Sequence, residues 1–297
     1  MWLALGPRRY DVSHRALVMG IVNRTPDSFY DAGRFFDLDG CLGQAEQLVA
    51  DGADVLDVGG VKAGPGPEVG EDEELERVVP VIEVLHERLD VALSCDTWRA
   101  SVARAAYAAG AAVGNDISGF ADPDYLPAAA AAGASVVATH IRLGPRIRDP
   151  EPRYDDVVAE VARFLAERAA RAEAAGIGTE RIVVDAGLDL GKTPAQSLAL
   201  LQGSADLAGL GYPLLLSASH KPFLGALLDL DVADRHQATI AAHAVGIVGG
   251  CRILRAHDAR AARRVADVLA AVLSARYDRD ARDDVDARDA RGEGDAI

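Results

Sequence analysis

Polar side chains follow most of the short apolar runs of this chain, at the point where each run ends. These side chains are Asn23, Asp96, Asn115, Asp116, His140, Asp185, Ser219, His220, Lys221, Arg255, His257 and Asp258. A carboxylate at the end of a buried strand costs free energy unless it is paired or hydrogen-bonded. Capping of a following helix would account for one or two of them, such as Asp96 and Asp258. It does not account for six or more, so we expect a shared binding site.

The side chains of this expected site fall into two chemical groups. Three supply hydrogen-bond acceptors and one amide donor: Asp96, Asn115 and Asp185. Three others supply positive charge: Lys221, Arg255 and His257. The first group suits a flat heterocycle with N–H groups and a ring carbonyl, and the second suits a carbonyl oxygen and phosphates. Together they predict a ligand in which a polar ring is joined to a phosphate ester. No Ser-His-Asp or Cys-His set has a suitable context, so nucleophilic catalysis is not indicated.

Two glycine-rich stretches resemble nucleotide-binding loops without matching them. Residues 187–193, GLDLGKT, lack the spacing G-x-x-x-x-G-K-[ST], because Ala186 stands where the first glycine is required. Residues 55–70, VLDVGGVKAGPGPEVG, do not contain G-x-G-x-x-G. We therefore interpret the second stretch as a strand followed by a mobile loop at the rim of the site.

Eight β-rich apolar runs alternate with segments of helical periodicity, which predicts a single-domain (β/α)8 TIM barrel. The predicted strands are residues 16–23, 54–60, 91–97, 111–118, 134–140, 181–187, 212–219 and 251–257. Between them, residues 71–89 carry an apolar stripe at helical spacing and acids in the first turn. The carboxyl ends of barrel strands meet at one mouth, so the polar side chains would share one ligand. A doubly wound sheet with a single switch point is the alternative.

Composition limits the class of protein. The net charge of −15 argues against a nucleic-acid-binding surface. No apolar run approaches the ~20 residues of a membrane span, and the apolar patch at the start is too short for a signal peptide. Three dispersed cysteines without C-x-x-C spacing favour reduced thiols. We therefore expect a cytoplasmic protein that acts on small molecules and binds neither nucleic acid nor membranes.

The chain is expected to divide into three parts. Residues 1–14 form an N-terminal extension, and residues 15–277 form the barrel. Residues 278–297 alternate acids with arginine and contain almost no apolar side chain. They cannot bury enough surface to offset the entropy of ordering, so we expect a charged, disordered tail.

Seven segments, in order, resemble the motifs of the dihydropteroate synthase family. Residues 19–33, MGIVNRTPDSFYDAG, are similar to the family's M-G-I-L-N-V-T-P-D-S-F-S-D-G-G, and residues 59–66, GGVKAGPG, correspond to its G-G-E-S-T-R-P-G. The others are SCDTWRASVA, GNDISG, DAGLDLGKT, SASHKPFLGALL and LRAHD. The resemblance covers roughly residues 15–275, nearly all of the expected fold.

This resemblance implies a homodimeric barrel enzyme of folate synthesis. The implied reaction joins 6-hydroxymethyl-7,8-dihydropterin diphosphate to 4-aminobenzoate and releases diphosphate. The implied catalytic residues are Asp96, Lys221 and Arg255, and the implied substrate-binding residues are Asn115, Asp185, His257, Ser219 and Ala63. Arg255 would lie over the pterin ring and, with His257, hold the diphosphate. Asn23 would contact a Mg²⁺ ion on the diphosphate.

Departures from the family's pattern cluster around the expected arylamine subsite. Residues 61–64, Val-Lys-Ala-Gly, stand where the family has Glu-Ser-Thr-Arg. Leu190 replaces a usual Phe, His220 a usual Arg, and Thr139 a frequent Met. Lys62 would restore charge but not the bidentate fork of an arginine.

These departures resemble the divergent second synthase-like paralogue of actinobacteria, which is regarded as lacking synthase activity. Three hypotheses follow. The first is a working synthase with an altered rim. The second is a pterin-binding relative with weak or no synthase activity, or with a different amine acceptor. The third is a non-catalytic pterin-binding or regulatory protein.

Overall fold

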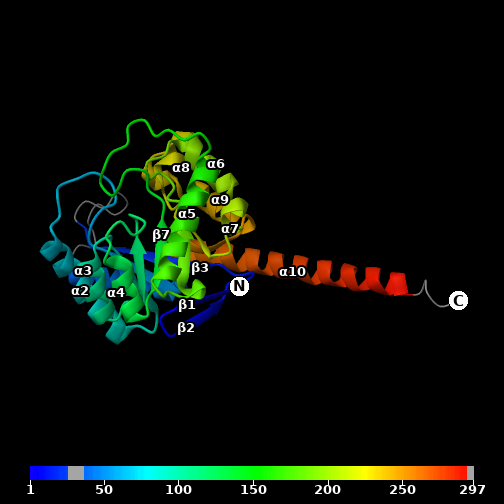
Figure 1. Cartoon of the computed structure of the whole chain (residues 1–297), viewed down its shortest axis with the longest axis horizontal. Helices are drawn as coiled ribbons and strands as arrows, with labels where there is room; N and C mark the ends of the chain where they lie inside the picture. Colours follow the sequence, from blue (N-terminus) through cyan, green and yellow to red (C-terminus); the bar gives the residue numbers. More distant parts are fainter. Residues whose placement is uncertain (26–36, 293–297) are drawn as a thin grey trace.

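The apolar runs form a closed barrel of eight parallel strands, with helices around it (Figure 1). The structure is a computed structural model that describes residues 1–25 and 37–292. The barrel strands are β3 (Leu17–Asn23), β4 (Val55–Gly59), β5 (Ala92–Asp96), β6 (Val113–Asp116), β7 (Ser135–Thr139), β8 (Ile182–Asp185), β9 (Leu214–Leu216) and β10 (Cys251–Ala256). Each lies within one predicted run, and β10 pairs with β3 to close the barrel. The predicted TIM barrel is confirmed, and the doubly wound alternative is wrong.

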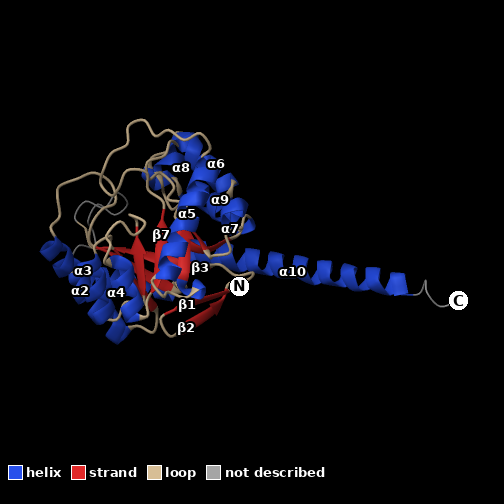
Figure 2. Cartoon of the chain, viewed as in Figure 1, coloured by secondary structure: helices blue, strands red, loops and turns tan. Residues whose placement is uncertain are grey.

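Helices follow the strands and cover the outside of the barrel (Figure 2). They are α1 (Leu38–Ala50), α2 (Glu71–Arg88), α3 (Ala100–Ala108), α4 (Tyr125–Ala132), α5 (Val157–Ala174), α6 (Pro194–Gln202), α7 (Ser204–Ala208), α8 (Pro222–Leu228), α9 (His236–Val248) and α10 (Ala259–Gly292), with 3-10 turns η1 (Thr179–Arg181) and η2 (Val232–Asp234). In α2, four acids occupy the first turn, where the helix dipole favours them. The predicted apolar stripe of α2 faces the core, because Val78, Val81, Ile82 and Leu85 are buried.

The N-terminal extension forms a hairpin across the amino ends of the barrel strands. Its strands β1 (Trp2–Leu5) and β2 (Arg8–Asp11) are antiparallel. Three of its side chains pack among the first apolar residues of the barrel strands: Leu3, Leu5 and Val12. Ser135 Oγ, at the start of β7, donates a hydrogen bond to the Ala4 carbonyl at 2.6 Å. The hairpin therefore covers this end, and a ligand enters from the carboxyl ends of the strands.

Helix α10 extends away from the barrel toward the C-terminus (Figure 1). Its first turns pack on the barrel through the buried Ala259, Ala262 and Ala266. The segment predicted to be disordered, residues 278–297, is described as helical to Gly292, and residues 293–297 lie outside the described residues. Alanine and arginine, which are frequent in this segment, have high helix propensity. The three-part division of the chain stays a prediction.

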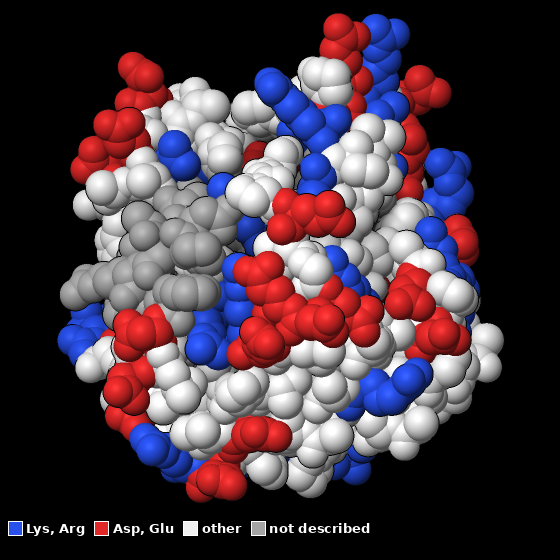
Figure 3. Space-filling model, turned by 90° about the vertical axis from the view of Figure 1, so that its left-hand side faces the viewer, with Lys and Arg blue, Asp and Glu red and all other residues white. Residues whose placement is uncertain are grey.

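Charges of both signs occur on the one face of the molecule that Figure 3 shows. On the face shown in Figure 3, acidic and basic side chains are interspersed among the residues described. The expectation that the protein binds neither nucleic acid nor membranes stays a prediction. Within residues 1–25 and 37–292, no helix has the length and apolar character to cross a bilayer.

Candidate active site

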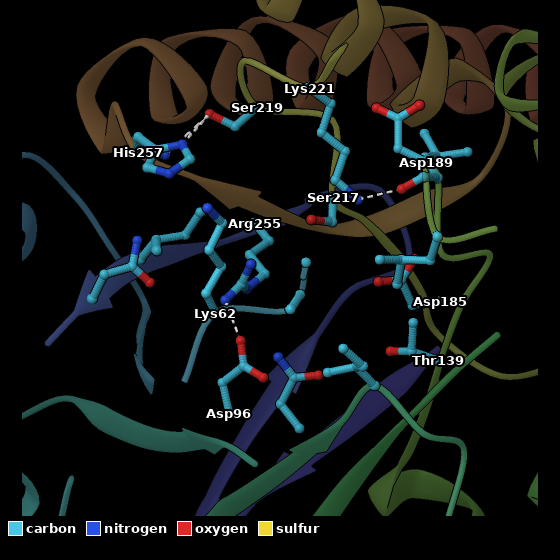
Figure 4. Close-up of a pocket in the computed structure, with 18 of the residues that line it drawn as sticks. Lys62, Asp96, Thr139, Asp185, Asp189, Ser217, Ser219, Lys221, Arg255 and His257 are labelled. Carbon is cyan, nitrogen blue, oxygen red and sulfur yellow. Dashed lines mark hydrogen bonds and ion pairs between the residues drawn. The ribbon is translucent and has the colours of Figure 1, made fainter. Parts of the chain in front are cut away.

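A pocket of about 470 Å³ opens at the carboxyl ends of the barrel strands (Figure 4). All nine residues proposed from the sequence line it: Asn23, Ala63, Asp96, Asn115, Asp185, Ser219, Lys221, Arg255 and His257. Each stands near the end of a barrel strand, so closure of the barrel brings them together. A pocket of this volume accommodates a small two-part substrate.

Asp57 is a fully buried carboxylate within β4 that the search of strand ends missed. Its Oδ1 accepts the Ser94 hydroxyl at 2.6 Å, and its Oδ2 accepts Asn115 Nδ2 at 2.9 Å and Arg255 Nε at 2.6 Å. Because only the amide nitrogen of Asn115 can donate, Asp57 fixes which way that amide points. An acid inside the apolar run DVLDVGG was the signal that could have identified it, since a buried carboxylate must be paired.

Arg255 bridges two carboxylates. Its Nη2 donates to Asp96 Oδ2 at 2.6 Å, in addition to the bond from Nε to Asp57. Burial by itself would lower the pKa of Arg255. The negative charges of Asp57 and Asp96 outweigh this effect, so the pKa is raised above its ordinary value. Burial also raises the pKa of Asp96 to about 7, although Arg255 opposes this shift. The expected position of Arg255 over a pterin ring stays a prediction.

Asp185 and Lys221 lie at another side of the pocket and are both held by one loop. Asp185 Oδ1 accepts the Gly187 N–H at 2.8 Å, and Lys221 Nζ donates to the Leu188 carbonyl at 2.6 Å (Figure 4). Burial raises the pKa of Asp185 and lowers that of Lys221, while their mutual attraction opposes both shifts. This side of the pocket presents an acceptor and a donor that suit ring N–H and carbonyl groups.

His257 lies in the pocket with a neutral ring, whereas the sequence suggested a positive charge. Ser219 Oγ accepts the backbone N–H of His257 at 3.2 Å and lies 3.0 Å from its Nδ1 (Figure 4). Which of these two atoms donates to the other depends on the tautomer of the ring. Burial, with help from Arg255, lowers the pKa of His257 well below its ordinary value. The ring is consequently neutral at pH 7.

Four other polar residues at strand ends do not line this pocket: Asp116, His140, His220 and Asp258. Asp116 accepts the backbone N–H groups of Ser118 and Phe120 and so shapes a turn. Asp258 accepts the Ala261 N–H at 2.9 Å, as the helix-capping alternative predicted for it. His140 lies 2.9 Å from the ammonium nitrogen of Lys192, outside the pocket.

The rim at residues 61–64 lines the pocket and is held through its main chain. The backbone N–H of Arg146 donates to the Ala63 carbonyl at 3.1 Å. The Arg146 guanidinium donates to the Lys62 carbonyl at 3.2 Å and to the Pro67 carbonyl. Figure 4 shows the Lys62 side chain in the pocket beside Arg255. Two of the remaining departures from the family's pattern, Thr139 and Leu190, also line the pocket, whereas His220 does not.

Asn23 is the residue through which a magnesium ion would be held. It presents an amide at the pocket, and among the described residues no cluster of three or more His, Cys, Asp or Glu side chains could bind a metal. Mg²⁺ is commonly held by one or two protein oxygens together with substrate phosphates and water. One amide oxygen therefore fits Mg²⁺ only when a phosphate-bearing ligand supplies the other oxygens. The part of the first motif from Pro26 to Gly33 lies outside the described residues.

A model of the family described as pterin binding enzyme matches residues 19–257. The chain belongs to this family. Among curated members of the pterin-binding enzyme family, it is 43% identical over 268 residues to a Mycobacterium tuberculosis protein called inactive dihydropteroate synthase 2, covering 88% of this chain and 84% of that protein. It is 40% identical over 270 residues to the dihydropteroate synthase of Bacillus subtilis, covering 90% of this chain and 92% of that protein.

Solved structures of pterin-binding enzymes agree with this assignment. A Yersinia pestis dihydropteroate synthase in complex with a sulfonamide drug superposes with a TM-score of 0.88 at 37% identity, covering 92% of this chain and 100% of that one. A Xanthomonas albilineans dihydropteroate synthase with 4-aminobenzoic acid gives 0.84 at 39% identity, covering 92% and 98%. The predicted resemblance to this family, including its inactive second paralogue, is confirmed.

Proposed function

We propose that this protein binds 6-hydroxymethyl-7,8-dihydropterin diphosphate and is a transferase of the dihydropteroate synthase type. The observation that carries this proposal is the meeting of five side chains in one pocket: Asp96, Asn115, Asp185, Lys221 and Arg255. In the proposed complex, the amide and carboxylates face the ring N–H groups, and Lys221 faces the ring carbonyl. Ala63 and Ser219 lie among the residues that would contact the rest of the substrate.

The proposed reaction exchanges one bond at the pterin methylene carbon for another. The C–O bond to diphosphate breaks and its electron pair leaves with the diphosphate, while the arylamine nitrogen forms a new C–N bond and then loses a proton. Arg255 and Lys62 supply positive charge near the leaving group, and in the tautomer with its proton on Nε2 the neutral His257 ring supplies a hydrogen bond. Fixed negative charge on Asp96 and Asp185 would stabilise the cationic methylene. No strong general base is required, because the neutral amine releases its proton only after attack.

Mg²⁺ fits this site through Asn23 and diphosphate oxygens, and would supply further charge neutralisation of the leaving group. Asn23 would then act by keeping the diphosphate end of the substrate at the end of β3. A homodimer in the cytoplasm is also part of the proposal. Exposed valines on two adjoining helices support an interface there: Val245 and Val248 on α9, and Val268 and Val272 on α10. Light scattering at micromolar protein concentration would measure the oligomeric state.

A second candidate function is pterin binding with weak or no use of 4-aminobenzoate. It is favoured by the rim, where residues 61–64 offer neither a hydroxyl nor a guanidinium, and by the 43% identity to proteins called inactive. Loss of an arginine partner for the acceptor carboxylate costs about 1.5–3 kcal/mol, or roughly 10- to 150-fold in acceptor affinity.

Two measurements separate these candidates. Calorimetry with a dihydropterin diphosphate analogue and Mg²⁺ should show binding, and no heat would reject both. An end-point assay with Mg²⁺ and a panel of aromatic amines, read by mass spectrometry, identifies the acceptor. The double variant Ala63→Thr, Gly64→Arg should increase product formation from 4-aminobenzoate. Normal turnover by the unmodified protein would reject the altered-acceptor candidate.

A further inference from the structure

Lys192 is a buried cation that the proposed reaction does not use. Its side chain is only 7% exposed. Its Nζ lies 2.8 Å from the Gly187 carbonyl, 3.0 Å from the Leu190 carbonyl and 3.3 Å from the His140 carbonyl. A fourth acceptor, His140 Nδ1, lies at 2.9 Å. Burial and the neighbouring Lys192 charge lower the pKa of His140 to about 3, so the ring is neutral and free to accept.

The stretch GLDLGKT thus has the reverse polarity of the phosphate loop that it resembles. In a phosphate loop, backbone N–H groups point at an anion. Here the carbonyls point at the ammonium group of the loop's own lysine. The turn needs left-handed backbone, with φ of 63° at Gly187, 67° at Asp189 and 63° at Gly191. At Gly187 a Cβ would lie 1.9 Å from the His140 carbonyl oxygen, so only glycine fits.

This loop forms a wall of the proposed pterin pocket. Three consecutive residues of it line the pocket: Leu188, Asp189 and Leu190. The same loop holds two proposed pterin-recognising residues, because the Gly187 N–H bonds Asp185 and the Leu188 carbonyl accepts Lys221. The shape of the loop therefore sets where both side chains stand.

We propose that Lys192 is a positioning residue: its ammonium group organises residues 187–191 from within, as a bound cation would, and so presents Asp185 and Lys221 to the pterin. The effect on ligand binding rests on the proposed function, whereas the effect on the loop does not. Without the ammonium group, three carbonyls would face a cavity with no donor. The loop would turn them outward, and the two side chains that it holds would move with it.

Charge on Lys192 makes the arrangement sensitive to pH. The pKa of Lys192 is lowered to about 7, mainly by burial and also by the charge of Lys221, while Asp185 and Asp189 oppose the shift. His140 is neutral, and Tyr154 bonds the Gly191 carbonyl at 2.9 Å without contributing charge near pH 7. Arg142, across from Gly191, is paired with Asp149. The ammonium form is present below about pH 7 and is lost as the pH rises, and the neutral amine has one donor fewer for four acceptors.

The test compares Lys192→Met, which keeps the length of the side chain, with Ser135→Ala as a matched control. Ser135 also loses a buried hydrogen bond, but at the hairpin end of the barrel. In Lys192→Met, amide exchange in residues 187–191 should accelerate, and the Kd for 6-hydroxymethylpterin diphosphate with Mg²⁺ should rise about 10- to 100-fold. Ser135→Ala should melt at a lower temperature and keep the Kd of the unmodified protein.

A second measurement on the unmodified protein covers the case in which Lys192→Met does not fold. Between pH 6 and 8.5, amide exchange in residues 187–191, corrected for its intrinsic pH dependence, should accelerate along with deprotonation of Lys192 followed by ¹³Cε NMR. In Lys192→Met, unchanged amide exchange in the loop together with a Kd within about twofold of the unmodified protein would overturn the proposal. In the unmodified protein, loop exchange that does not change as Lys192 loses its proton would also overturn it. If the unmodified protein does not bind the pterin, the proposed function is wrong, and loop exchange alone decides the role of Lys192.

Discussion

Replacement of Asp57 by asparagine examines the buried group that orients the proposed pterin site. The asparagine side chain has the same size, but it loses the charge and one of the two acceptor oxygens. Three donors point at this position: Ser94 Oγ, Asn115 Nδ2 and Arg255 Nε. The new amide group would place its own N–H against at least one of them. Arg255 would be left with one carboxylate partner, Asp96.

The cost of this change follows from those contacts. A hydrogen bond to a charged group contributes about 1.5–3 kcal/mol, and loss of one member of a buried ion pair costs about 3–5 kcal/mol. Because Asp96 still neutralises Arg255, we expect the free energy of unfolding to fall by about 2–4 kcal/mol. Pterin affinity should fall about tenfold as well, since Asn115 and Arg255 lose the group that orients them.

Equilibrium unfolding in urea measures the first effect, and calorimetry with a pterin diphosphate analogue measures the second. Asp54→Asn is the matched control, because Asp54 pairs with Arg263 at 2.9 Å and accepts the Val18 N–H at 2.8 Å, near the amino ends of the strands. It should lower stability without changing affinity. An Asp57→Asn protein with stability within about 0.5 kcal/mol of the parent and unchanged affinity would refute the orienting role.

Three further outcomes are expected. Because burial raises the pKa of Asp96 to about 7, its carboxylate is charged above that pH and protonated below it, so calorimetric pterin affinity should fall as the pH decreases through 7. Asp96→Asn should abolish this acidic limb, and a limb that persists would assign it to another group. Arg146→Ala should accelerate amide exchange in residues 61–67 with a loss of about 1 kcal/mol in stability, and unchanged exchange would mean that other contacts hold the rim. Leu3→Ala, in the hairpin, should lower the free energy of unfolding by about 2–5 kcal/mol in urea at unchanged pterin affinity, and a loss below about 1 kcal/mol would show that the hairpin is dispensable.

The barrel could be predicted because its determinants are local. Each of the eight strands is an apolar run with a turn at its end, and each observed strand falls within its predicted run. Placement of Asp96, Asn115 and Asp185 around one pocket followed from barrel closure alone, since parallel strands expose their carboxyl ends on the same side.

Features that depend on direction and environment could not be predicted in this way. Asp57 lies within its strand, so a search of strand ends passed over it. The role of Lys192 could not be predicted, because the sequence does not show whether carbonyls or N–H groups face the centre of a loop. His257 is uncharged because it is buried beside Arg255. The two residues are close in sequence, but only the fold places them in surroundings of low dielectric constant.

The hydrogen bonds from Arg146 to the rim at residues 61–67 bear on how the sequence of the rim can change. Its hydrogen bonds reach the carbonyl oxygens of Lys62, Ala63 and Pro67, and every amino acid has such a carbonyl. Substitutions in this segment can therefore replace the chemistry offered to the second substrate while the path of the chain stays the same. The side of the pocket proposed to bind the acceptor can therefore change during evolution while the proposed pterin-binding side is retained.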